Sequence, residues 1–412
     1  MTFDHAAAAL AEAARNRQSV RILGAATKRG WGVPTPAPDL ELRSTGLDQI
    51  VEHNAGDLTA VLQAGVPLAA AQATFAAAGQ MLALDPPLAG GTGATTDDRP
   101  TDRHGTKPTA GIATNATRPT AGVASDDEPT AGDATIGGIV ATGDCGPLGH
   151  RYGAPRDLVL GMTVALSDGT IARSGGKVIK NVAGYDIAKL FAGSFGTLGM
   201  ILSVSVRLHP LPATTATALG AGDDPELLRD AARSLAAAPL ELESLDMRWR
   251  AGRGQLLARS GGTQAARRTE RVAQLMRRAG LAAVDVADRD HELWATQRAA
   301  QRSPDRAIVR VAGRPSALAA VIRATEQCGG RLVGRAALGS SYIEVDPEAV
   351  GRLRRALPPR TFSTLLDAPA ALRARLDPWG SADGPALGLM RTVKARFDPT
   401  RACNPGLFAG GI

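Results

Sequence analysis

Aromatic side chains are scarce in this chain of 412 residues, where Phe, Trp and Tyr together make up 3% of the sequence. Hydrophobic residues still make up 44%, so the cores must be built mainly from Ala, Val and Leu. Proteins that bind single-stranded nucleic acids stack the bases on aromatic rings. The formal charge of +7 comes with no basic motif of known geometry, so no nucleic-acid partner is expected.

Cysteine is also rare. Cys145, Cys328 and Cys403 lie far apart in the sequence, and no CxxC spacing occurs. This pattern argues against an iron–sulfur cluster or a zinc site held by this chain alone. It also argues against a disulfide framework, so a reducing cytoplasmic setting is expected.

Long apolar runs are missing, so no transmembrane segment is expected. The first 18 residues have no basic start followed by an apolar core, so they predict a surface helix and not a secretory signal. Any association with the inner face of a membrane would therefore be peripheral and made through partners. The length is sufficient for two or three domains.

Glycine, in contrast, gathers in residues 175–199, which read GGKVIKNVAGYDIAKLFAGSFGTLG. Glycine places no side chain between the main chain and a bound group. The alternating run at 200–206 predicts a strand after this turn, and residues 185–192 predict a short helix before it. Spacing alone is equally compatible with a tight packing turn and with a binding turn.

Two further small-residue segments have the same character. GAATKRGWG at 24–32 follows a predicted strand at 19–23, and ATIGGIVATG occupies 134–143. Successive backbone N–H groups in such segments can bind an anion. For the first of them an ordinary surface turn is the alternative.

Residues 90–133 are polar, and PTAG recurs in them at Pro108, Pro119 and Pro129. A period this short without an apolar face predicts a disordered insertion that arose by tandem duplication. A partner-binding loop or a lid is the alternative.

The region after residue 213 changes character. It predicts strands and helices in the order strand–helix–strand–strand–helix, with strands at 245–250, 255–259, 308–311, 331–336 and 341–345 and helices at 264–279, 315–328 and 347–357. This order is typical of an antiparallel sheet with its helices on one face, ferredoxin-like in outline.

The stretch KNVAGYDIAKLFAGSFGTLG resembles the signature of flavoproteins with a PCMH-type FAD-binding domain, the vanillyl-alcohol oxidase family. Within it, the FAD-binding E subunits of bacterial glycolate oxidases are the most similar. The resemblance covers residues 20–212 and returns at 397–407, FDPTRACNPGL. It implies an α+β protein with a two-lobed FAD-binding domain at 1–212, a ferredoxin-like cap or substrate domain at 213–385, and a segment at 386–412 that returns to the first domain.

The resemblance also implies that the small-residue segments line one FAD site. The cofactor-binding residues that it implies are Gly24, Ala25, Ala26, Thr27, Pro87, Thr135, Gly137, Gly138, Val140, Gly143, Arg156, Asp157, Gly196, Thr197, Gly199 and Ile201. Some relatives attach FAD through a histidine or cysteine, which the first loop here lacks. Non-covalent FAD is therefore expected, with attachment at Cys145 or His150 as the alternative.

For the chemistry, the resemblance implies oxidation of a 2-hydroxy acid, in which a hydride leaves the α-carbon while a base takes the hydroxyl proton. Tyr185, Asn181 and Lys180 are the polar candidates for catalysis. A buried structural tyrosine and an exposed lysine are the alternatives for two of them. Catalytic relatives carry a His-rich metal motif, whereas the six histidines here are isolated, so no metal site is expected.

Three functions remain open. The first is the FAD-binding subunit of a glycolate oxidase-type complex, which oxidises glycolate or a similar acid beside a second flavin subunit and passes electrons to an iron–sulfur subunit. The second is a stand-alone FAD-dependent dehydrogenase of a 2-hydroxy acid such as lactate. The third is a non-catalytic flavoprotein that stabilises its partner.

Overall fold

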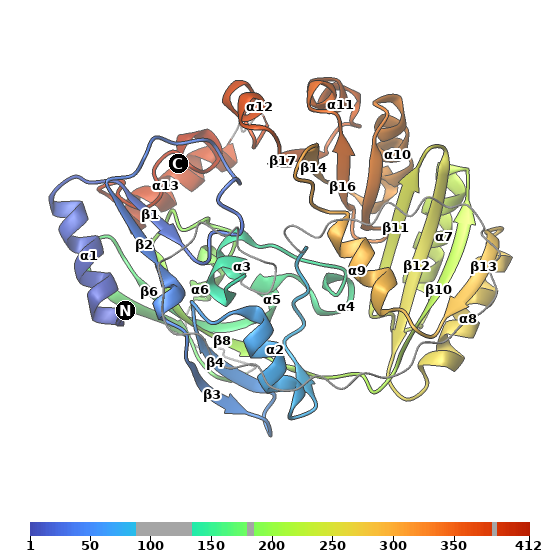
Figure 1. The fold of residues 1–412 in the computed structure, drawn as a ribbon, viewed down its shortest axis with the longest axis horizontal. Helices are drawn as coiled ribbons and strands as arrows, with labels where there is room; N and C mark the ends of the chain where they lie inside the picture. The colour runs from blue at the N-terminus through green and yellow to red at the C-terminus, as the bar shows by residue number, and fades with distance from the viewer. Residues whose placement is uncertain (88–133, 179–184, 381–384) are drawn as a thin grey trace, which may run out of the picture.

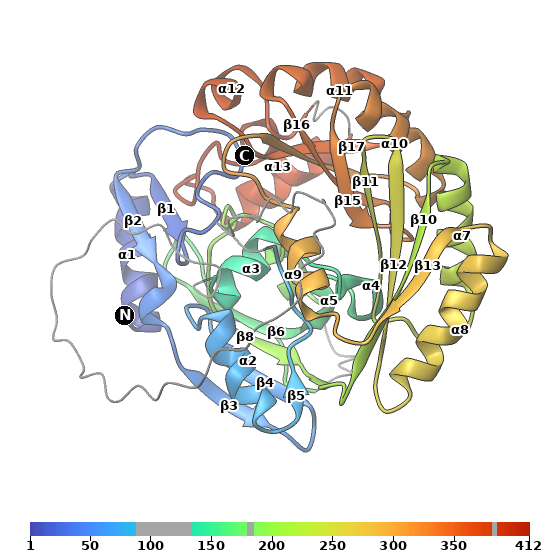
Figure 2. The same cartoon turned by 45° about the vertical axis from the view of Figure 1, so that its right-hand side comes forward.

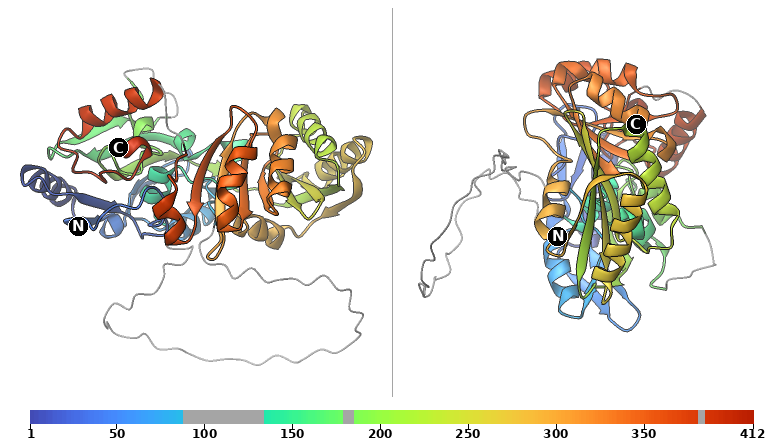
Figure 3. Two further views of the ribbon diagram at one scale, coloured as in Figure 1. Left: turned by 90° about the horizontal axis from the view of Figure 1, so that it is seen from above. Right: turned by 90° about the vertical axis from the view of Figure 1, so that its right-hand side faces the viewer.

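The computed structural model describes residues 1–87, 134–178, 185–380 and 385–412 (Figure 1). The insertion predicted at 90–133 lies outside these ranges. The chain forms an N-terminal half around a five-stranded sheet and a second half around an eight-stranded sheet. The two halves lie side by side along the longest axis (Figure 3). Helices and antiparallel strands occupy separate layers, so the predicted α+β class is confirmed.

The five-stranded sheet is antiparallel throughout, with the order β3-β4-β8-β6-β7. Its strands are β3 (Ile50–Asn54), β4 (Thr59–Gln63), β6 (Val159–Ala165), β7 (Ile171–Gly175) and β8 (Met200–Arg207). The strand predicted at 200–206 from alternation agrees with β8. Along β8, Met200 and Leu202 pack toward one face of the sheet and Ile201 toward the other.

Helices cover both faces of this sheet. On one face lies α1 (Phe3–Arg15), whose Leu10 is fully buried. On the other lie α2 (Leu68–Ala76), α3 (Ile136–Thr142), α5 (Pro155–Leu158) and α6 (Ala188–Phe191). The remaining elements of this half are the parallel pair β1 (Val20–Leu23) and β2 (Leu40–Arg43), the short pair β5 (Gln80–Met81) and β9 (His209–Pro210), and α4 (Gly149–Tyr152).

The eight-stranded sheet consists of two βαββαβ units joined edge to edge. The first unit is β10 (Thr215–Gly222), α7 (Pro225–Ala237), β11 (Ser244–Arg250), β12 (Arg253–Gly261), α8 (Ala265–Arg278) and β13 (Ala282–Ala287). The second is β14 (Ala307–Ala312), α10 (Leu318–Gln327), β15 (Arg331–Arg335), β16 (Ser340–Val345), α11 (Val350–Ala356) and β17 (Phe362–Asp367). The units meet where β11 pairs with β15, giving the order β13-β10-β12-β11-β15-β16-β14-β17.

The sequence predicted this ferredoxin-like pattern once, and the structure contains it twice. The strands that were missed are the outer ones, and β10 explains why. Its sequence TATALGAG includes Gly220 and Gly222, which are unfavourable in strands. In the fold a Cβ at Gly220 would lie 2.9 Å from Leu281 Cδ1, so the glycine leaves room for the leucine side chain.

The two faces of the eight-stranded sheet differ. Helices α7, α8, α10 and α11 cover the outer face (Figure 2). On this face Leu245, Trp249 and Ile343 are buried in one apolar core. The inner face is turned toward the N-terminal half and carries α9 (His291–Ala299). Trp294 and Gln297 of α9 bond to side chains of this inner face.

The C-terminal segment returns to the N-terminal half, after α12 (Ala370–Arg375) and α13 (Pro385–Phe397). Cys403 forms a parallel bridge with Val20 of β1. Lys394 lies 2.6 Å from Asp398 in an ion pair whose side chains are 6% and 0% exposed. The same ammonium donates to the carbonyl oxygens of Thr197 and Cys403, so one buried cation joins α13, the glycine-rich turn and the C-terminal segment.

No described helix has the length and apolar character that crossing a bilayer requires.

We expect Lys394→Met to lower the free energy of unfolding by about 3–5 kcal/mol, because it leaves the carboxylate of Asp398 buried without its cation. Urea unfolding followed by circular dichroism measures this. The matched control is Lys189→Met, which breaks an exposed pair with Asp186 and should cost less than about 1 kcal/mol. Equal losses in the two variants would contradict the structural role given to Lys394.

Candidate functional site

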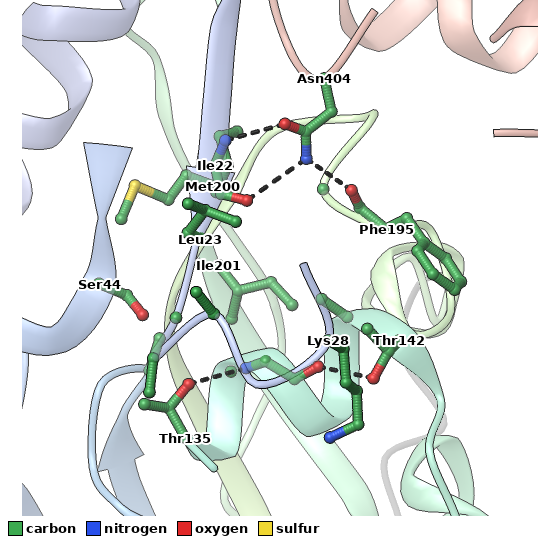
Figure 4. A pocket seen from close by; sticks show the side chains of 18 of the residues that line it. Ile22, Leu23, Lys28, Ser44, Thr135, Thr142, Phe195, Met200, Ile201 and Asn404 are labelled. Carbon is green, nitrogen blue, oxygen red and sulfur yellow. Dashed lines mark hydrogen bonds between the residues drawn. The ribbon is translucent and has the colours of Figure 1, made fainter. Parts of the chain in front are cut away.

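A cleft opens in the N-terminal half beside the end of β1, with an empty volume of about 860 Å³ that includes its mouth. Three segments line it: the loop after β1, helix α3 with its cap Thr135, and the glycine-rich turn that leads into β8 (Figure 4). The C-terminal segment adds Asn404 and Leu407 to the wall. Segments from the beginning, middle and end of the chain therefore meet at one site.

The loop after β1 supplies free hydrogen-bond donors. Within the described residues, the backbone N–H groups of residues 25–28 have no acceptor. Ala26 has a φ of 61°, a left-handed conformation that turns successive N–H groups toward one side of the chain. Unpaired backbone donors at a cleft are suited to an anionic ligand such as a phosphate group.

Helix α3 forms a wall of the cleft, but the backbone N–H groups of its first turn are already hydrogen-bonded within the protein. The N–H groups of Ile136 and Gly137 bond to the carbonyl oxygens of Val66 and Ala64, and that of Gly138 bonds to the Thr135 hydroxyl. We expected residues 134–143 to offer open backbone to a ligand. This expectation is wrong for the first turn, because the sequence places the helix cap Thr135 at its start.

Glycine is required where the loop meets α3. A Cβ at Gly24 would lie 2.2 Å from the Thr135 Oγ1, so only glycine permits this approach. In the third segment Gly196 has a φ of +70°, and a Cβ there would lie 2.8 Å from the Asn404 Nδ2. The glycines at the cleft therefore bring its walls together.

Asn404 holds two of these walls in place (Figure 4). Its Oδ1 accepts from the backbone N–H of Ile22 at 2.8 Å, and its Nδ2 donates to the carbonyl oxygen of Phe195 at 2.7 Å. Sequence reasoning did not single out this residue. The available signal was the return of the family resemblance at 397–407, which contains it.

Lys28 lies at the inner end of the cleft. Its Nζ is 3.0 Å from Asp144 Oδ2, and the two side chains are 7% and 1% exposed. Asp144 directly follows α3 and its C-cap, so this buried ion pair fixes the loop to the end of the helix. The positive charge of Lys28 is thus already balanced within the protein.

The cleft ends where the eight-stranded sheet begins. Arg335 of β15 is 3% exposed and donates to the carbonyl oxygens of Cys145 and Gly146 at 2.6 and 3.1 Å. Trp31, at the end of the loop, donates its indole N–H to Asp367 of β17, which also accepts from Arg302 at 2.6 Å. Both the loop and the turn after α3 are therefore bonded directly to the second half of the protein.

Asp85 lies at this junction and accepts from the backbone N–H of Leu148. Burial raises the pKa of Asp85 to about 7, although the charges of Arg298 and Arg335 oppose the rise. Its carboxyl group is therefore protonated in much of the folded protein near neutral pH.

Most of the predicted cofactor-binding residues line the cleft. These are Gly24, Ala25, Ala26, Thr27, Thr135, Gly137, Gly138, Gly196, Gly199 and Ile201.

The other predicted residues lie elsewhere. Val140 is 1% exposed and faces the core, and Gly143 forms the left-handed end of α3. Arg156 is exposed, and the Asp157 carboxylate caps α5 by accepting from Ala154. Pro87 is buried outside the cleft lining, and the hydroxyl of buried Thr197 donates to Ser194.

Of the three catalytic candidates, the structure places Tyr185 alone. Lys180 and Asn181 lie outside the described ranges. Tyr185 is 91% exposed and outside the cleft lining, so the alternative of a buried tyrosine is wrong. The helix predicted at 185–192 is reduced to α6 (Ala188–Phe191).

A comparison with protein families gives a match to the FAD binding domain over residues 2–95 and 114–175. The chain contains an FAD-binding domain. FAD is therefore the cofactor, as the sequence predicted, and the unpaired donors of residues 25–28 fit its pyrophosphate.

Among characterised proteins, the chain is 29% identical to the glycolate oxidase subunit GlcE of Escherichia coli over 49% of this chain and 45% of that protein. It is 41% identical to the glycolate oxidase subunit GlcD of Bacillus subtilis over 27% of this chain and 25% of that protein. A D-lactate dehydrogenase of Archaeoglobus fulgidus is 44% identical over 20% of this chain and 18% of that protein. Each match spans less than half of the relative's length.

Among solved structures, an alkyldihydroxyacetonephosphate synthase superposes with a TM-score of 0.63 at 11% identity, over 97% of this chain and 74% of that one. At this identity the likeness concerns the fold alone, and it extends over both sheets. The predicted PCMH-type fold with an antiparallel second half is confirmed.

We expect Gly24→Ala to weaken FAD binding about 10-fold, because the added methyl group must displace Thr135 and with it the loop. The measurement is the flavin released by acid from protein equilibrated with limiting FAD. Gly176→Ala is the control, since nothing lies within 4 Å of a Cβ there. Full FAD binding by the Gly24 variant would contradict this account of the cleft.

Asp85 should make stability depend on pH. Its folded pKa of about 7 lies above the unfolded value of 3.8, so folding is favoured at low pH and this contribution is lost as the pH rises through 7. The melting temperature of Asp85→Asn should therefore exceed that of the unaltered protein by a difference that grows between about pH 5 and pH 8. The exposed Asp230→Asn should give a constant difference, and a constant difference for Asp85→Asn would refute the assignment.

Proposed function

We propose that this chain is the FAD-binding subunit of a glycolate oxidase-type complex, which oxidises glycolate or a similar 2-hydroxy acid to the 2-oxo acid. The observation that carries the proposal is the position of the donor-lined cleft. Its inner end meets the polar inner face of the eight-stranded sheet, so a bound cofactor and a small polar substrate can share one enclosed junction.

FAD, when bound, supplies a hydride acceptor. The chain's own residues have other tasks. The N–H groups of residues 25–28 would hold the pyrophosphate, and Ile201 and Phe195 give the cleft apolar walls. The bonds from Arg335 and Trp31 close the junction between the two halves and limit the entry of water.

The cofactor would be held without a covalent bond. The cleft-lining positions of the first loop have no cysteine or histidine, and Cys145 and His150 do not line the cleft. Burial raises the pKa of the Cys145 thiol to about 12, which leaves it a poor nucleophile.

The partners in this proposal are a second flavin subunit and an iron–sulfur subunit that receives the electrons. Similarity to two differently named subunits of glycolate oxidases supports membership of a multi-subunit assembly. Lys180, Asn181 and Tyr185 remain the candidates for catalysis.

A second candidate is a stand-alone dehydrogenase of a 2-hydroxy acid, which the similarity to a D-lactate dehydrogenase favours. A third is a non-catalytic flavoprotein. If the third holds, a complex assembled with Gly138→Trp, whose large side chain would fill the cleft, stays fully active.

The deciding experiment uses the purified chain loaded with FAD and mixed anaerobically with glycolate or D-lactate and an electron-accepting dye. If the chain is a glycolate oxidase-type subunit, the dye should be reduced only after the co-purified partner subunits are added. The Gly138→Trp variant should then lose this activity. Rapid reduction by the chain alone would favour the stand-alone dehydrogenase. An active complex containing Gly138→Trp would overturn a catalytic role for this flavin site.

A further inference from the structure

A row of side chains crosses the inner face of the eight-stranded sheet. The register places Tyr342 of β16 between Val333 and Arg310, and Arg310 of β14 beside Thr364 of β17. Directly paired residues project from the same face of a sheet. Val309, the neighbour of Arg310 along β14, packs under the helices of the outer face, so Arg310 projects from the inner face.

This row lies against the inner end of the cleft. Val333 and Tyr342 share an apolar cluster with Trp31, and Phe195, which lines the cleft, packs against that cluster. The Tyr342 hydroxyl lies 3.4 Å from the carbonyl oxygen of Cys145, in the turn after α3. The row therefore faces the end of the proposed FAD site.

Three other arginines on this side of the sheet have acceptors. Arg302 bonds to Asp367, Arg259 to Asp290, and Arg335 to the carbonyl oxygens after α3. Arg310 has no hydrogen bond or ion pair with any part of the chain that the structure describes, and its Nε is buried. A buried guanidinium donor without an acceptor is unfavourable, so an external acceptor would stabilise it.

The surrounding charges leave Arg310 unbalanced. Asp144 pairs with Lys28, and Asp246 accepts from Gln297. Burial raises the pKa of Tyr342, and the charges of Arg335 and Arg310 oppose that rise, so both cations act on the phenol. The junction therefore carries a positive charge next to a hydroxyl group and favours an anion.

We propose that Arg310, with Tyr342 beside it, binds the carboxylate group of the acid that is oxidised. A planar guanidinium can donate two parallel hydrogen bonds to a carboxylate. The Tyr342 hydroxyl has one hydrogen, which it donates over a long 3.4 Å contact to the carbonyl oxygen of Cys145, and it can turn to donate this hydrogen to the carboxylate instead. The inference rests on the proposed function, and it adds the residue that selects an acid over a simple alcohol.

Oxalate is the probe, because it has carboxylates but no hydrogen to lose. Its binding to the FAD-loaded chain should change the flavin absorbance. We expect Arg310→Gln to weaken oxalate binding by about 10- to 100-fold and Arg310→Lys by less, since lysine keeps the charge but not the two parallel donors. Arg323→Gln, which removes an exposed arginine paired with Glu226 on the outer, helix-covered side, is the control and should bind oxalate normally.

FAD content and melting temperature establish that each variant is folded. Unchanged oxalate binding in Arg310→Gln overturns the proposal that Arg310 binds the carboxylate, even if glycolate is oxidised. Lost binding supports it even if no hydroxy acid reduces the unaltered protein, a result that would count only against the proposed function. The proposal for Arg310 is also overturned if neither oxalate nor glycolate changes the flavin spectrum of the unaltered protein.

Discussion

The buried ion pair of Lys394 and Asp398 is the interaction on which the cleft depends. It holds the C-terminal segment against the glycine-rich turn, and that segment places Asn404 between β1 and the turn. The three walls of the cleft come from distant parts of the chain. Backbone bonds from the glycine-rich turn to the carbonyl oxygens of Val140 and Ala141 join that turn to α3, whereas Asn404 and the buried Lys28–Asp144 pair join β1 and its loop to the other two walls. Such charged and amide groups form strong bonds in a dry environment.

Much of the fold could be predicted from the sequence, because the periodicity of short apolar runs is a local property. Strands β3, β4, β6 and β8 and helix α8 follow directly from such runs. The first βαββαβ unit could not be recognised in full, since its strand β10 contains glycines whose role appears only when Leu281 packs against them. Propensity is overridden there by tertiary packing.

The location of the candidate site could be predicted from the glycines, because glycine is required where two segments of the main chain pack closely. Gly24 and Gly196 meet other walls of the cleft within distances that no side chain would permit. The partners of those glycines were not predictable, because Thr135 and Asn404 are common polar residues whose roles arise from long-range contact. Tyr185, singled out for its chemistry within a glycine-rich motif, is exposed. The motif thus located the site better than it identified its chemical groups.

The bond between Trp31 and Asp367 gives the loop at the cleft a second role. The loop whose residues 25–28 would hold the cofactor is also bonded to the second half of the protein, through Trp31 and through the bond that Arg373 of α12 donates to the carbonyl oxygen of Gly32. Ligand affinity and the docking of the two halves are then one linked equilibrium, and linkage is reciprocal. Any protein that displaces the eight-stranded sheet would loosen the cofactor, and the cofactor would resist that displacement by the same free energy.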